Sequence, residues 1–99
     1  MTGDGMPRLS EEEIEERLAK MRDWEREGNY IKRTYEFPSF MKAIEFINRV
    51  AELAEEADHH PNLENVWRTV ILKFTTHDEG GLTKRDFNMA SKINAIGIE

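Results

Sequence analysis

The stretch from Phe40 to Ala57 limits the possible folds more than any other part of the chain. It follows Pro38 and Ser39, and its apolar residues recur three or four positions apart, which is the spacing of one helical face. We expect a helix over this stretch, with Ser39 as its N-cap and Pro61 as the residue that stops it. The apolar stripe comprises Phe40, Ala43, Ile44, Ile47, Val50, Ala51 and Ala54, widened on one side by Phe46 and Leu53.

This stripe is wider than one side of a small sheet needs. Two interpretations fit it equally well. The helix either buries one wide face in the core, or it buries part of that face and uses the rest as an interface with another copy.

A pair of strand-like segments lies on each side of this helix. Before it, residues 24–29 predict a short strand and a turn at Gly28-Asn29, and residues 30–37 predict a second strand. After it, residues 63–67 and 69–76 predict two more strands with a tight turn near Arg68. By the period of two, one face of the last strand should point toward the helices through Val70, Leu72 and Phe74. The opposite face should carry Thr69, Ile71, Lys73, Thr75 and His77.

Two shorter helices complete the pattern. Ser10 and Glu13 form a capping-box signature, followed by the apolar stripe Ile14, Leu18, Met21. Thr83 and Asp86 repeat the signature before a stripe that we expect Gly97 to end. This second stripe comprises Phe87, Ala90, Ile93 and Ile96.

The element order is therefore α-β-β-α-β-β-α. It predicts an α+β fold with a single four-stranded antiparallel sheet and three helices packed on one face. The 99 residues suffice for one domain, which we place at residues 10–99, after a flexible N-terminal tail at residues 1–9.

The composition excludes several classes of protein. The net charge of −6 argues against a nucleic-acid surface. The absence of cysteine excludes disulfide scaffolds and thiolate metal sites. No apolar run approaches the roughly 18 residues that span a bilayer, and the N-terminus lacks an apolar signal core. We therefore expect a cytoplasmic protein that binds neither nucleic acid nor membrane.

The three histidines are the candidate functional residues. His59 and His60 directly precede Pro61, and His77 follows the third and fourth strand segments. They are either structural residues at element ends, metal ligands, or acid–base catalysts. Adjacent side chains diverge in extended backbone, which disfavours chelation of one ion by His59 and His60. Glu55 and Asp58 are placed to orient imidazole rings, whereas Trp24 and Trp67 are by themselves more typical of core or interface positions.

A linked series of motifs resembles the pterin-4a-carbinolamine dehydratases (4a-hydroxytetrahydrobiopterin dehydratases), over about residues 24–96. The segments that carry this resemblance are Glu55-x-x-x-His59-His60-Pro61, the aromatic Trp67, Thr76-His77-Asp78-x-Gly80-Gly81-Leu82-Thr83 and Asp86, with Trp24 and Phe37-Pro38-Ser39-Phe40 before them.

The resemblance implies a hydro-lyase that dehydrates 4a-hydroxytetrahydropterin to quinonoid dihydropterin and so recycles the tetrahydropterin cofactor of aromatic amino acid hydroxylases. It implies no metal and no further cofactor, because the pterin is the substrate. It also implies a homodimer or homotetramer. The alternative is a non-catalytic binding module that acts as a dimerisation or transcription-coactivator partner through the second helix. A metal-dependent hydrolase is a third, weaker hypothesis.

The matching positions imply catalytic roles for four residues. His59 and His77 would transfer protons, His60 would bind or position the pterin, and Glu55 would orient. Either His59 or His77 can be the acid. The implied substrate-binding residues are Trp24, Asp58, His59, His60, Pro61, Thr75, Thr76, His77, Asp78 and Asp86.

Overall fold

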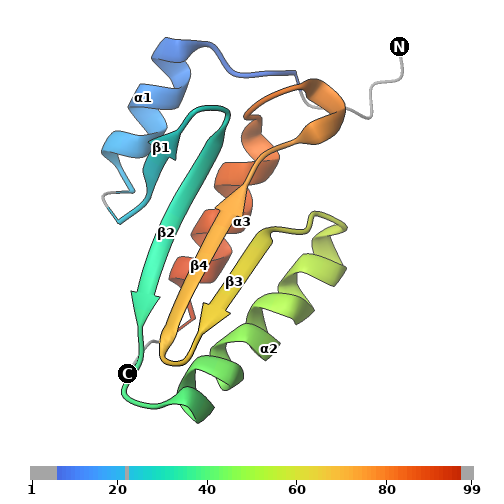
Figure 1. Ribbon diagram of the computed structural model, residues 1–99. Helices are drawn as coiled ribbons and strands as arrows, with labels where there is room; N and C mark the ends of the chain where they lie inside the picture. The colour runs from blue at the N-terminus through green and yellow to red at the C-terminus, as the bar shows by residue number, and fades with distance from the viewer. Residues whose placement is uncertain (1–6, 22, 97–99) are drawn as a thin grey trace.

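The computed structural model describes residues 7–21 and 23–96. Within these residues the chain forms three α-helices, one four-stranded sheet and a short 3-10 helix (Figure 1). The elements are α1 (Glu11–Ala19), β1 (Glu25–Glu27), β2 (Tyr30–Glu36), α2 (Phe40–Ala57), β3 (Asn62–Val66), β4 (Thr69–Phe74), η1 (His77–Glu79) and α3 (Lys84–Asn94). This order confirms the predicted α-β-β-α-β-β-α arrangement.

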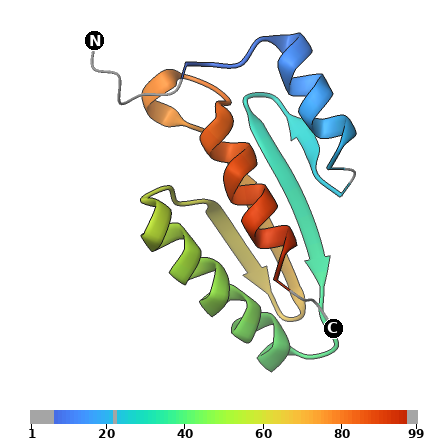
Figure 2. The same ribbon diagram turned by 180° about the vertical axis from the view of Figure 1, so that it is seen from behind.

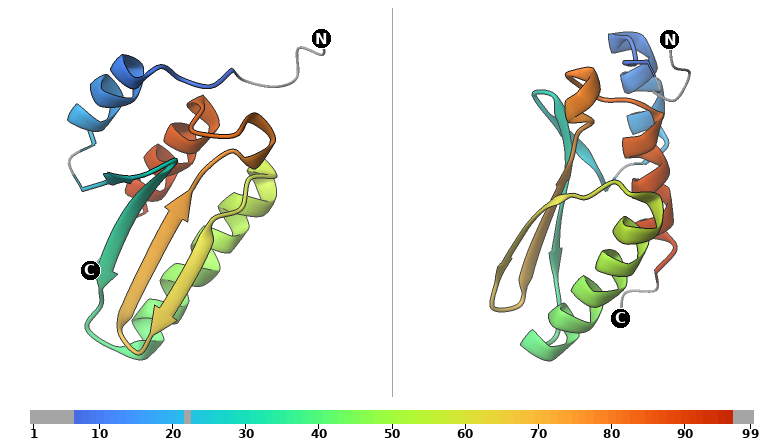
Figure 3. Two further views of the ribbon diagram at one scale, coloured as in Figure 1. Left: turned by 45° about the horizontal axis from the view of Figure 1, so that its top comes forward. Right: turned by 90° about the vertical axis from the view of Figure 1, so that its right-hand side faces the viewer.

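The sheet is antiparallel throughout, with the strand order β1-β2-β4-β3. The helices lie on one of its faces and leave the other face open (Figure 3). The central strands pair Ile31 with Phe74, and the β3–β4 pair aligns Leu63 with Leu72. The fold class predicted from the sequence is therefore confirmed.

The core fills the space between the sheet and the two longer helices, which run across it side by side (Figure 2). Val70, Leu72 and Phe74 of β4 are all fully buried, as the period of two predicts. Each fully buried large side chain of this kind contributes about 1.5–3 kcal/mol to folding. The central strand β4 therefore anchors the sheet beneath the helices.

The buried face of α2 differs from the predicted stripe, although its bounds and its Ser39 cap match the prediction. Phe46 lies at the centre of the buried face, because its ring packs 4.6 Å from the Tyr35 ring and 5.0 Å from the Phe37 ring. Phe40 and Ala51, which the pattern places in the stripe, are exposed. Aromatic packing on β2 thus sets the rotation of the helix.

The end of α2 corrects a second expectation. The helix ends before Pro61 is reached, because Asp58 adopts the left-handed conformation (φ 52°, ψ 44°). The amide of His59 donates to the Ala54 carbonyl (3.1 Å), and that of Asp58 donates to Glu55 (3.2 Å). This pair of bonds is a Schellman motif, with an aspartate where glycine is usual.

The end of β4 departs from the predicted strand. The strand stops at Phe74, and both Thr75 and Thr76 are buried, so the alternation of faces ends there. The Thr75 hydroxyl donates to the Asn29 carbonyl (2.6 Å), and His77 opens η1. His77 is therefore carried by a helical turn and not by the open face of the sheet.

The remaining helix ends follow local signals. Both capping boxes form, Ser10 with Glu13 and Thr83 with Asp86. Helix α3 ends at Asn94, and Gly97, which we expect to end it, lies outside the described residues. The same is true of residues 1–6 of the expected flexible tail. In residues 7–9, the amide of Leu9 donates to the Leu82 carbonyl (2.9 Å), beside the buried Gly81.

Candidate active site

At one end of the sheet the segment after α2 approaches the segment after β4 (Figures 1 and 3). These two segments carry His59, His60 and His77, which line one pocket. This pocket has a volume of about 210 Å³. It is lined by Asp58, His59, His60, Thr75, Thr76, His77, Asp78 and Arg85. Three separate parts of the chain thus contribute: the turn after α2, the end of β4 with η1, and the first turn of α3.

His59 is the buried histidine of this pocket. The residue is 7% exposed, and its ring stacks on Phe74, with 5.8 Å between the ring centroids and 16° between the planes. Its Nε2 lies 2.6 Å from Oδ1 of Asp86. His59 is therefore held on one side by an aromatic face and on the other by a carboxylate.

Asp86 is fully buried and lies behind His59. Its Oδ2 accepts from the Thr76 hydroxyl (2.9 Å) and from the Thr83 amide (3.0 Å). Since Thr76 gives its only hydroxyl proton to Asp86, the Thr83 hydroxyl must donate to Thr76 Oγ1, 2.8 Å away. Every neighbour of Asp86 can therefore donate, which is the environment of an ionised carboxylate.

This network fixes the tautomer of His59. An ionised Asp86 accepts the proton on His59 Nε2, so in the neutral ring Nδ1 carries the lone pair. Nδ1 makes no hydrogen bond to any of the described residues. The arrangement matches the carboxylate–histidine pair of acid–base catalysts, in which a buried carboxylate orients the ring and stabilises its protonated form.

His60 points the other way. Its side chain is 53% exposed, and its Nε2 lies 2.7 Å from Oε2 of Glu55, which is itself exposed. The rings of the two adjacent histidines diverge. They therefore face different partners, as the sequence suggests.

His77 also lines the pocket and is exposed. Its ring makes an edge-on contact with Tyr30, with 6.3 Å between the centroids. The pocket thus combines one buried, oriented imidazole with two exposed ones.

The other predicted site residues fall into three groups. Asp58, Thr75, Thr76 and Asp78 line the pocket, and Asp86 contacts it through His59. Pro61 is half-buried and does not belong to the lining. Trp24 is a core residue that packs on Phe74 at 6.1 Å and donates from Nε1 to Asn94 (2.9 Å). Trp24 therefore does not line the pocket and is connected to it only through Phe74, on which His59 also packs.

Arg85 is the lining residue that the sequence pattern does not reveal. Its Nη2 donates to the main-chain carbonyl of Asp58 (2.9 Å). The sequence did contain one signal for Arg85. A positive charge in the first turn of a helix is unfavourable next to the helix dipole, which suggests that the residue has another role.

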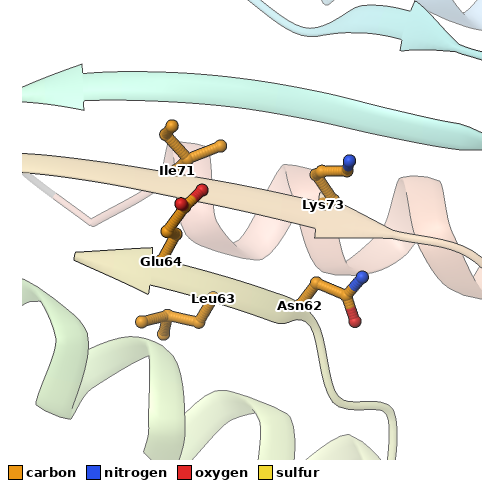
Figure 4. A pocket seen from close by; sticks show the side chains of 5 residues that line it. All are labelled: Asn62, Leu63, Glu64, Ile71 and Lys73. Atoms are coloured by element: carbon orange, nitrogen blue, oxygen red, sulfur yellow. The ribbon is translucent and has the colours of Figure 1, made fainter. Parts of the chain in front are cut away.

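A second hollow, of about 260 Å³, lies on the open face of the sheet (Figure 4). Asn62, Glu64, Ile71 and Lys73 stand on this face, whereas Leu63 points toward α2. Its one amine, Lys73, already pairs with Glu27 (2.9 Å). Without a histidine, this hollow offers less acid–base chemistry than the first.

Two further findings concern residues 7–21 and 23–96 only. No three or more histidine and carboxylate side chains there are grouped to hold a metal ion. No helix there is both long and apolar enough to cross a membrane.

Comparison with known proteins now decides the family. The model of the family described as pterin 4 alpha carbinolamine dehydratase matches residues 7–96. The chain belongs to this dehydratase family. A Roseiflexus sp. (strain RS-1) relative, provisionally named pterin-4-alpha-carbinolamine dehydratase, is 53% identical over 90% of this chain and 96% of its own length. A Sulfolobus acidocaldarius relative with the same provisional name is 42% identical over 90% of this chain and 98% of its own.

A solved structure of the dehydratase family supports the fold. The crystal structure of a transcriptional coactivator/pterin dehydratase from Brucella melitensis superposes with a TM-score of 0.86 at 37% identity. The match covers 90% of this chain and 97% of the other. The motif residues of the dehydratase resemblance divide in space: His59, His60, His77 and Asp86 gather at the pocket, whereas Trp67 lies in the β3–β4 turn at the far end of β4.

Proposed function

We propose that this protein is a hydro-lyase that dehydrates 4a-hydroxytetrahydropterin to quinonoid dihydropterin and so recycles a tetrahydropterin cofactor. The observation that carries the proposal is the hydrogen bond between His59 and the buried Asp86, at the wall of a pocket that also holds His77. Membership of the dehydratase family supports the choice of substrate.

The reaction needs two proton transfers. The C4a–O bond breaks while a C4a=N5 double bond forms, so N5 loses a proton and the departing hydroxyl gains one to leave as water. Hydroxide is a poor leaving group, and general acid–base help of this kind accelerates such steps by about 10²–10⁴-fold. The pterin is the substrate, and the proposal requires no further cofactor.

His59 is the base in this proposal. Its Nε2–H is held by Asp86, which leaves Nδ1 to accept the proton from N5. The buried carboxylate then stabilises the imidazolium that forms. His77, an exposed residue of the same pocket, donates its proton to the 4a-oxygen and regains one from water. His60 positions the pterin, and Glu55 orients the His60 ring through their 2.7 Å contact.

The test is the rate of dehydration of a freshly generated 4a-hydroxypterin. We expect His59→Gln and His77→Gln each to lower kcat by at least about tenfold, whereas His60→Gln raises KM more than it lowers kcat. Lys20→Gln, an exposed change at the end of α1, serves as the control. The proposal fails if His59→Gln and His77→Gln both leave the rate at the control value.

A second candidate function rests on a different observation. The Brucella melitensis relative is described as a transcriptional coactivator as well as a pterin dehydratase. In this chain α2 exposes Phe40 and Met41, and the β3–β4 hairpin exposes Val66 and Trp67. We propose that these residues make the chain a homodimer or homotetramer, and that a partner role would use the same α2 surface. Loss of oligomers on mutation of this surface with dehydration unchanged would separate the two functions.

A further inference from the structure

Arg85 joins two parts of the pocket that are distant in sequence. It stands in the first turn of α3 and is half-buried. Its Nη2 donates to the main-chain carbonyl of Asp58, 2.9 Å away in the turn after α2. A hydrogen bond from a charged donor is stronger than one between neutral groups.

The carbonyl that Arg85 holds belongs to a strained residue. Asp58 has φ 52° and ψ 44°, a conformation that glycine adopts freely and that aspartate adopts at a cost. This conformation turns the chain between α2 and the histidine pair. It sends His59 inward onto Phe74 and Asp86, and it sends His60 outward to Glu55.

Two consecutive residues of α3 therefore bind two consecutive residues of the turn after α2. Asp86 binds the ring of His59, and Arg85 binds the backbone of Asp58. The first contact sets the tautomer of the ring, and the second sets the path of the chain that carries it. Neither contact can replace the other, because one acts on a side chain and the other on a main-chain carbonyl.

We propose that Arg85 is a positioning residue, which holds Asp58 in its left-handed conformation and thereby places His59 for catalysis. The catalytic part of this inference rests on the proposed dehydratase function. The neighbouring Lys84 is exposed and does not line the pocket, so the inference concerns Arg85 and not positive charge in general. A lysine at position 85 keeps the charge but lacks the planar fork of a guanidinium.

The first experiment compares Arg85→Ala, Arg85→Lys and the control Lys84→Ala in the dehydration assay. We expect Arg85→Ala to lower kcat by about tenfold with KM changed less than about threefold, since the contact orders the catalytic groups. Guanidinium ion at millimolar concentration should restore much of the lost rate to Arg85→Ala but none to Arg85→Lys. Lys84→Ala should match the wild type. A raised KM with unchanged kcat would overturn the inference, because Arg85 would then bind substrate.

The second experiment needs no enzymatic activity. Hydrogen exchange of the His59 amide reports the Schellman bond to Ala54. We expect Arg85→Ala to speed this exchange by about tenfold while the melting temperature stays near that of Lys84→Ala. Asp58→Gly relieves the backbone strain, so adding it to Arg85→Ala should slow the exchange again. Unchanged exchange in Arg85→Ala would overturn the positioning role. If the wild type does not catalyse dehydration but the variants show the expected changes in exchange, only the proposed function is overturned.

Discussion

Nε2 of His59 lies 2.6 Å from Oδ1 of Asp86, although 27 residues separate the two in the chain. The same aspartate completes the capping box of α3 through the amide of Thr83. One buried carboxylate therefore stabilises a helix start and orients a pocket histidine. Stability and the chemistry of the site are consequently coupled at this residue.

Replacing Asp86 by asparagine should affect both properties. The amide keeps the size of the side chain but brings two donors to a place where all neighbours donate. We expect the free energy of unfolding to fall by about 1–3 kcal/mol and kcat to fall at least about tenfold. Urea titration and the dehydration assay measure the two effects. Asp23→Asn, at an exposed carboxylate, is the control, and equal behaviour of the two variants would contradict the coupling.

The two capping boxes offer a matched comparison. Ser10 caps α1 at the surface, whereas Thr83 caps α3 in the buried network beside the pocket. We expect Ser10→Ala to cost about 1 kcal/mol of stability with kcat unchanged. Thr83→Ala should cost more and also lower kcat, because Thr76 loses the donor that orders its hydroxyl toward Asp86. If kcat is the same in both variants, the buried network does not contribute to catalysis.

Local signals explain how much of the fold the sequence predicts. Ser39 marks the start of α2, the helical period identifies it as a helix, and the alternation in β4 identifies the buried face of that strand. Both capping boxes are equally local, since three residues separate their partners. Each of these features depends on residues within a few positions of one another, so the sequence alone is enough to predict it.

The predictions from the sequence that were wrong depend on contacts between distant parts of the chain. The rotation of α2 depends on where Phe46 meets Tyr35, and the pattern along one helix does not contain that contact. The left-handed turn at Asp58 occurs where glycine is usual, and Arg85 of a distant helix binds its carbonyl. Motif spacing groups the histidines, but only the folded chain reveals that His59 is buried on Asp86 while His60 faces water.

Tyr35 leads to a prediction on pH. Burial raises the pKa of its phenol from 10.0 to about 12, against the opposing effect of Arg33 above the ring. Above pH 10 the unfolded chain releases this proton while the folded chain keeps it, so the folded state binds more protons and stability falls as pH rises toward 12. Below pH 10 the phenol is protonated in both states, so Tyr35 makes its full contribution to the free energy of unfolding.

Tyr35→Phe should remove this dependence. Among the described residues the hydroxyl has no hydrogen-bond partner, so its removal should also stabilise the fold by about 1 kcal/mol at neutral pH. Thermal unfolding of both proteins from pH 8 to pH 11.5, about the range in which a free phenol titrates, measures the difference. The gap between the two proteins should widen with pH, and a constant gap would show that Tyr35 does not cause the alkaline loss.

The exposed hairpin leads to a prediction on assembly. Trp67 is 66% exposed at φ 53°, a strained place for a tryptophan, and Val66 beside it is 67% exposed. Exposed apolar groups of this size commonly mark contacts between proteins. Trp67→Gly removes the aromatic surface, and it suits the turn because glycine adopts a positive φ without strain. We expect the wild type to run as a dimer or tetramer in light scattering, and Trp67→Gly to shift toward monomer without loss of melting temperature. Ala19→Ser, an exposed change on α1, should leave the oligomer intact. A monomeric wild type, or an unchanged oligomer in Trp67→Gly, would show that this hairpin is not an interface.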